Sequence, residues 1–72
     1  MPKSKPERFV KYYRDGSVWA RGWLLDDKPV GFWAFYRIDG TKLRTGYFRE
    51  GVEAGKWTHY DHGGNVQRVE EL

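Results

Sequence analysis

Two histidines and an aspartate lie close together in the segment His59-Tyr60-Asp61-His62. Imidazole nitrogens and carboxylate oxygens are ligands that Zn²⁺ accepts, so the segment is a candidate metal site. A closed zinc shell needs further ligands, but the chain contains no third histidine and no cysteine. We therefore predict that these are surface histidines, and we predict neither a metal site nor a cofactor.

Aspartates recur at Asp15, Asp39 and Asp61, and carboxylates lined up in this way could serve as a general acid and base. Aspartate next to glycine is far more often a turn residue. Ser4 and Ser17 lack a neighbouring His–Asp pair that would activate a hydroxyl nucleophile. The sequence therefore predicts turn-forming aspartates, no catalytic residues and a protein that is not an enzyme.

The side chains named above lie within an internal repeat with a spacing of 24 residues. The pattern Gly-x-Trp-x-x-Tyr occurs at residues 31–36 and again at residues 55–60. Other pairs with the same spacing are Gly16 and Gly40, Gly40 and Gly64, Gly22 and Gly46, Trp23 and Tyr47, and Leu24 and Phe48. Such an array indicates one structural unit that is used repeatedly.

Each copy predicts two strands, because aromatic residues favour strands and Asp-Gly pairs favour tight hairpin turns. We expect strands near residues 9–14, 17–25, 31–37, 42–48, 56–60 and 66–70, with longer joints at residues 26–29 and 49–54. Short joints favour antiparallel neighbours. The predicted fold is all-β, with a single antiparallel meander sheet of about six strands.

Gly22 and Gly46 fall inside predicted strands, where glycine normally weakens pairing. One explanation is a β-bulge. The explanation that we favour is that a neighbouring ring lies across the bare backbone, with Tyr13, Tyr36 and Tyr60 as the candidate rings.

The net charge of +3 comes from the N-terminus. Residues 1–14 hold five basic residues and one acidic residue, whereas residues 15–72 hold eight basic and nine acidic residues. We predict a flexible basic tail over residues 1–8 and a single domain over residues 9–72. The absence of cysteine, of a signal-like segment and of a long apolar run leads us to expect a soluble cytoplasmic protein.

The repeat resembles MORN-type repeats, and most closely the bacterial variant found in the YwqK-like antitoxin family. The matching residues are Tyr13, Asp15, Gly16, Gly22, Gly31, Trp33, Tyr36, Asp39, Gly40, Gly46, Tyr47, Gly51, Gly55, Trp57 and Tyr60. The resemblance implies stacked β-hairpins in an elongated sheet. It also implies protein–protein association, lipid association in some members, and the neutralisation of a partner toxin.

Strand alternation predicts large apolar groups on both faces of the sheet, more than so short a chain can cover by itself. Exposed aromatic residues mixed with arginine are typical of binding surfaces. We predict a protein-binding module, with an antitoxin or immunity-type role as one form of it. The predicted partner-binding residues are Trp19, Arg21, Trp23, Trp33, Phe35 and Trp57.

Two other ligands remain open at this point. The first is an anionic ligand, either nucleic acid or acidic lipid, bound by the N-terminus and by arginines in the strands. The residues predicted for it are Lys3, Lys5, Arg8, Arg21, Arg37 and Arg44. The second is another copy of the chain, packed through a sheet face as a homodimer.

Overall fold

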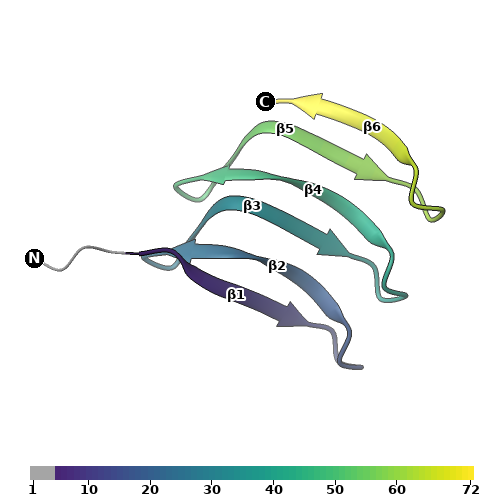
Figure 1. The fold of residues 1–72 in the computed structure, drawn as a ribbon, viewed down its shortest axis with the longest axis horizontal. Coiled ribbons are helices and arrows are strands. Elements are labelled where there is room, and N and C mark those ends of the chain that lie inside the picture. The colour runs from purple at the N-terminus through teal and green to yellow at the C-terminus, as the bar shows by residue number, and fades with distance from the viewer. Residues whose placement is uncertain (1–4) are drawn as a thin grey trace, which may run out of the picture.

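The computed structural model describes residues 5–72, which form one sheet of six strands (Figure 1). The strands are β1 (Glu7–Tyr12), β2 (Val18–Leu25), β3 (Lys28–Tyr36), β4 (Lys42–Arg49), β5 (Val52–Tyr60) and β6 (Val66–Glu71). Each strand pairs antiparallel with the next one in the chain, and the described residues contain no helix. The all-β meander predicted from the sequence is therefore confirmed.

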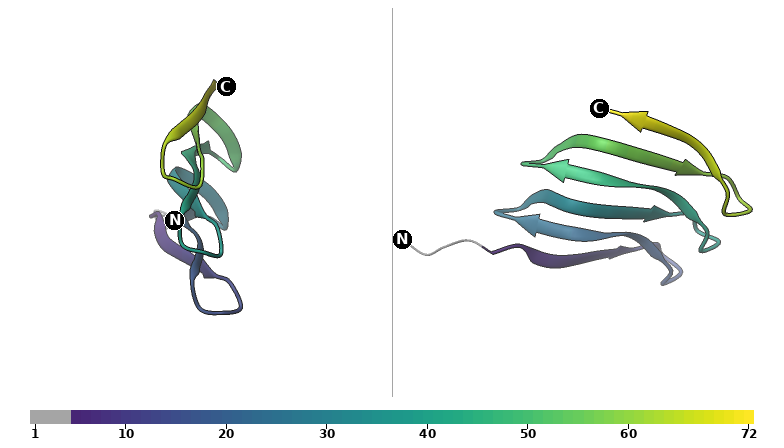
Figure 2. Two further views of the ribbon diagram at one scale, coloured as in Figure 1. Left: turned by 90° about the vertical axis from the view of Figure 1, so that its right-hand side faces the viewer. Right: turned by 45° about the horizontal axis from the view of Figure 1, so that its top comes forward.

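Nothing within residues 5–72 covers either face of this sheet, because the chain forms a single layer (Figure 2). The shortest extent of the molecule is 12 Å, against 47 Å and 32 Å along the other two axes. Any core must therefore be built from side chains that pack against one another on a face. In the described part of the chain, no helix is long and apolar enough to span a bilayer.

The turns at one end of the sheet are shorter than the sequence indicated. Leu25 pairs with Lys28 around Asp26 and Asp27, whose φ angles are 53° and 66°. Two central residues in the left-handed region define a type I′ turn, whose twist matches the strands it joins. The corresponding turn of β4 and β5 uses residues 50 and 51 in the same way. The longer joints predicted at residues 26–29 and 49–54 are therefore wrong.

The first strand also begins earlier than expected. Glu7 and Arg8 pair with Leu24 and Trp23 of β2, although both belong to the segment that the sequence assigned to a tail. This pairing fixes the direction of the Arg8 side chain relative to the sheet.

One extra residue is inserted at the same place in every second strand. Lys11 pairs with Ala20 and Tyr12 with Val18, which leaves Trp19 without a partner opposite it. The same shift leaves Leu43 unpaired in β4, and Gln67 in β6. These β-bulges are 24 residues apart, so they belong to the repeated unit. Because a bulge adds one residue to a strand, the residues before and after it no longer follow one continuous alternation between the two faces.

The two strand glycines make room for tryptophan rings. A Cβ atom built on Gly22 would overlap the indole of Trp33, and one built on Gly46 would overlap the indole of Trp57. Trp33 and Trp57 are 5 % and 1 % exposed, so they are the main buried side chains of the molecule. The prediction that a ring lies across each glycine is confirmed.

The rings proposed for that role were wrong. Tyr13 instead donates a hydrogen bond from its hydroxyl to the carbonyl of Tyr36 at 2.7 Å, joining neighbouring hairpins. Tyr60 approaches Thr45, with 3.5 Å between the two hydroxyl oxygens. Tyr13 and Tyr60 therefore link strands through their hydroxyl groups.

Candidate functional site

The register of the sheet assigns each strand side chain to one of two faces, because directly paired residues point to the same side. One face carries a continuous cluster of rings, and we call it the core face. The rings are Phe9, Trp19, Trp33, Phe35, Phe48 and Trp57. Neighbouring ring centroids in this cluster are 5.3 to 6.3 Å apart, the usual range for stacked and edge-to-face pairs. The core face is thus the hydrophobic core of the molecule.

Arg44 lies over this cluster. Its guanidinium carbon is 4.8 Å from the ring centroid of Phe35 and 5.0 Å from that of Trp57. The guanidinium is also 3.3 Å from a carboxylate oxygen of Glu53. The charge of Arg44 is therefore balanced by a carboxylate and by two ring faces.

Charges within the strands of the core face balance one another. The residues involved are Glu7, Lys11, Arg44, Glu53, Arg68 and Glu70, three of each sign. His59 Nε2 lies 2.9 Å from Glu70 Oε1, and this hydrogen bond is the main reason that the pKa of Glu70 is lowered. The core face therefore has no excess charge to attract an ion.

The opposite face carries a strong positive charge, and we call it the basic face. Its charged strand residues are Arg8, Arg21, Lys28, Lys42, Arg49, Lys56 and Glu71. This set contains six basic residues and one acidic residue, so the net positive charge of the strands lies on this face. Such a one-sign surface raises the local concentration of anions.

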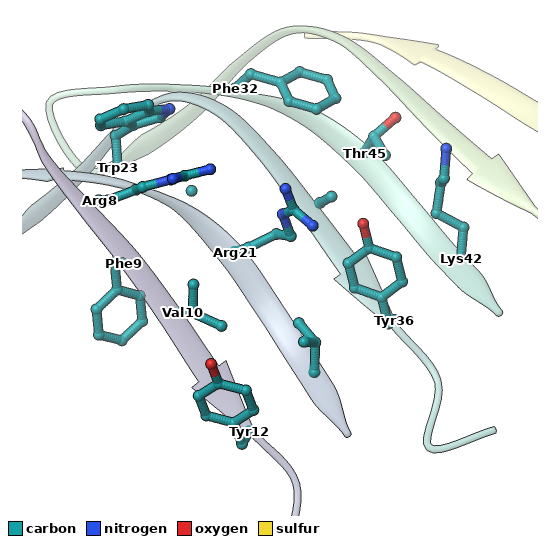
Figure 3. A pocket seen from close by; sticks show the side chains of 13 residues that line it. Arg8, Phe9, Val10, Tyr12, Arg21, Trp23, Phe32, Tyr36, Lys42 and Thr45 are labelled. Atoms are coloured by element: carbon teal, nitrogen blue, oxygen red, sulfur yellow. The ribbon is translucent and has the colours of Figure 1, made fainter. Parts of the chain in front are cut away.

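A groove of about 580 Å³ crosses the basic face from β1 to β4. Figure 3 shows the guanidinium groups of Arg8 and Arg21 extending over it, with Trp23 at one end and Lys42 towards the other. Neither arginine forms an ion pair within residues 5–72. Their charges are thus free to meet a ligand.

Aromatic rings surround these charges. Trp23 is 41 % exposed and Phe32 48 % exposed, and both line the groove. Tyr47 packs edge-to-face on Phe32 with ring centroids 5.4 Å apart. Lys42 Nζ lies 5.4 Å from the ring centroid of Tyr60. The groove therefore offers flat apolar surface directly beside unpaired cations.

The structure separates the six residues that the sequence predicted as one binding set. The bulge in β2 places Trp19 on the core face, opposite to Arg21 and Trp23, although simple alternation put the three together. The other three residues, Trp33, Phe35 and Trp57, lie in the ring cluster. Of the six, only Arg21 and Trp23 line the groove.

The six residues predicted for an anionic ligand also lie in different parts of the structure. Lys3 lies outside the described residues, and Lys5 is exposed just before β1. Arg8 and Arg21 line the groove. Arg37 donates hydrogen bonds to the carbonyls of Lys42 and Tyr60, at 2.9 and 2.7 Å, and so ties two turns together. Arg44, as described above, lies on the core face.

Most of the groove residues were not predicted from the sequence, and they include Tyr12, Phe32, Tyr36 and Lys42. Simple alternation puts Phe32 and Tyr36 on one side of their strand, and in the structure they share a face. Simple alternation puts Lys42 and Thr45 on opposite sides of their strand, whereas the bulge at Leu43 brings them to the same face. The β-bulge that recurs in β2, β4 and β6 is the feature that would have placed these side chains on the correct face.

The recurring aspartates shape turns. Asp15 Oδ1 accepts hydrogen bonds from the Ser17 backbone N–H at 2.9 Å and from the Ser17 hydroxyl at 2.6 Å. Asp39 does the same with Thr41, at 2.9 and 2.7 Å. These side-chain and backbone hydrogen bonds lower the pKa of both carboxyls, as those from Asn65 and Gly63 do for Asp61. Within residues 5–72, no group of three or more His, Cys, Asp or Glu is placed to hold a metal ion.

No protein-family model, curated protein or solved structure that was compared with this chain matches it. The resemblance to MORN-type repeats therefore stays a prediction from the sequence.

Proposed function

We propose that this protein is a non-catalytic binding module that holds an anionic macromolecule against its basic face. The observation that carries the proposal is the separation of charge between the two faces of one thin sheet. Within the strands, the core face is neutral, whereas the basic face has six basic residues and one acidic residue. Like charges gathered in this way repel one another, and a bound anion relieves that repulsion.

The packing of the molecule supports the choice of face. Trp33 and Trp57 use the core face to build the interior, so a ligand could reach them only by disrupting it. On the basic face, Trp23 and Phe32 are close to half exposed, and Arg8 and Arg21 have no acidic partner within residues 5–72. Tryptophan, tyrosine and arginine are the residues that contribute most at binding sites.

The proposal refines the predictions from the sequence. An anionic ligand was the second of those predictions, and two of its residues, Arg8 and Arg21, line the groove. A protein partner would have to present an acidic surface to fit the same face. The antitoxin role stays a prediction, which rests on the resemblance alone.

The test compares two charge-matched double variants on a heparin column. Arg8→Ala with Arg21→Ala removes two cations from the basic face, and Lys11→Ala with Arg68→Ala removes two from the core face. The net charge changes equally, so only the location of the charge differs. We expect the basic-face variant to elute at clearly lower salt than the core-face variant. Elution of both at the same salt concentration would refute the proposal.

A further inference from the structure

We infer that the anionic macromolecule is a single-stranded nucleic acid, whose bases stack on the rings of the basic face while its phosphates meet the cations. This inference rests on the proposed function and names its ligand. It depends on how the two kinds of side chain alternate across the groove.

Two of the three groove cations are paired directly with a ring, whereas Arg21 lies between Val10 and Ala34. Arg8 in β1 is paired directly with Trp23 in β2, and Tyr36 in β3 with Lys42 in β4. Side chains paired in this way have Cβ atoms about 4.5–5.5 Å apart. A nucleotide carries a flat base and a phosphate on one sugar, so a neighbouring ring and cation can hold both parts. An acidic peptide would use the cations and leave the rings without a matching group.

The exposure of the rings favours unpaired bases. Trp23 and Phe32 keep between two fifths and one half of their surface exposed, so each offers part of its ring to a ligand. In a duplex the bases are already stacked on one another, and they are reached only by elements that enter a groove. Proteins that bind single strands combine aromatic platforms with a positively charged path in this way.

The size of the groove sets the length of the strand. The groove runs from β1 to β4, which are separated by three inter-strand spacings, or about 14 Å. Phosphates in a stacked strand are about 3.4 Å apart, so this length accommodates roughly four of them. Arg8, Arg21 and Lys42 can neutralise three. The logarithm of the association constant should therefore fall with the logarithm of salt concentration at a slope of about −2.

The experiment measures the fluorescence anisotropy of a labelled short oligothymidylate titrated with the full chain. Trp23→Ala is compared with Trp19→Ala, because the two tryptophans lie in the same strand, are 41 % and 38 % exposed and occupy opposite faces. Base–aromatic stacking predicts that Trp23→Ala weakens binding by about 5- to 150-fold. Trp19→Ala should leave binding within about twofold of the wild type.

A second variant and two other probes separate the possible failures. Arg21→Ala should weaken binding and make the salt slope shallower by about 0.7. Thermal unfolding of every variant shows whether it is folded at the assay temperature. Polyglutamate and vesicles rich in acidic phospholipid are titrated alongside the oligonucleotide, and both should bind more weakly.

The outcomes are distinguishable. If polyglutamate or the vesicles bind as tightly as the oligonucleotide, and Trp23→Ala has no effect, the inference is wrong although a polyanion-binding function survives. If Trp19→Ala weakens binding as much as Trp23→Ala, the assignment of the face is wrong. If the wild type binds none of the three probes at low salt, the proposed function fails together with the inference.

Discussion

A substitution of one hydrogen by one methyl group, Gly46→Ala, should destabilise this protein severely. The added Cβ atom would overlap the indole of Trp57, which is the largest fully buried side chain of the described chain. Either the ring leaves its place or the two strands move apart. The cost should therefore depend on the presence of the ring and not on the backbone at residue 46.

The burial of the ring sets the size of the effect. An aromatic side chain buries 150–250 Å², which at about 25 cal/mol per Å² corresponds to roughly 4–6 kcal/mol. Partial relaxation of an overpacked core usually limits the loss to about 1–3 kcal/mol. We expect Gly46→Ala to cost about 3 kcal/mol. In a domain of this size each kcal/mol lowers Tm by about 4–8 °C, so Tm should fall by roughly 12–24 °C.

A double-mutant cycle with Trp57→Ala tests the cause. Once the ring is gone, Gly46→Ala should become stabilising by about 0.5–1 kcal/mol, since glycine in a strand interior is less favourable than alanine. Urea unfolding followed by circular dichroism measures all four proteins, in an osmolyte that keeps the weaker variants folded. Gly63→Ala is the control, because its Cβ would meet only the turn side chains of Asn65 and Asp61. An equal cost of Gly46→Ala in both backgrounds would refute the reasoning.

Two further predictions concern hydrogen bonds. The indole N–H of Trp33 donates to the carbonyls of Trp23 and Val30, both at 3.1 Å, whereas that of Trp57 has no acceptor among residues 5–72. Trp33→Phe should therefore cost about 1 kcal/mol more than Trp57→Phe in the same unfolding assay, and equal costs would contradict this. Hydrogen bonds from Thr41 lower the pKa of Asp39, so its contribution to stability is complete above the ordinary value of 3.8 and is lost as pH falls through the folded pKa. Carboxyl ¹³C shifts should give a midpoint below 3.8, and a midpoint at or above that value would contradict the assignment.

The strands were predictable because their signals are local. Asp15-Gly16 and Asp39-Gly40 are turn sequences, and the aromatic residues between the turns favour strands. The joint at Asp26-Asp27 was predicted but made too long, because left-handed backbone at two successive non-glycine residues is rarely predicted from residue type. The glycine inside a predicted strand indicated that a ring lies over Gly46, but it did not indicate which ring. A bare backbone reveals that something approaches it, but only the register reveals which side chain does.

The candidate site depends on information that no single strand contains. Each bulge shifts alternation by one residue, so it decides the face on which Trp19 or Lys42 lies. The bulge cannot be recognised from the sequence of that strand alone. Reading the strands without bulges mixes the two faces, and the mixture conceals the charge separation altogether. Once the bulges are included, the rings divide into a cluster on the core face and an exposed set on the basic face, and six of the nine strand cations lie on the basic face. The repeat therefore gives one thin sheet two different faces: Trp33 and Trp57 stabilise the fold on one, and Arg8, Arg21 and Trp23 remain free to bind on the other.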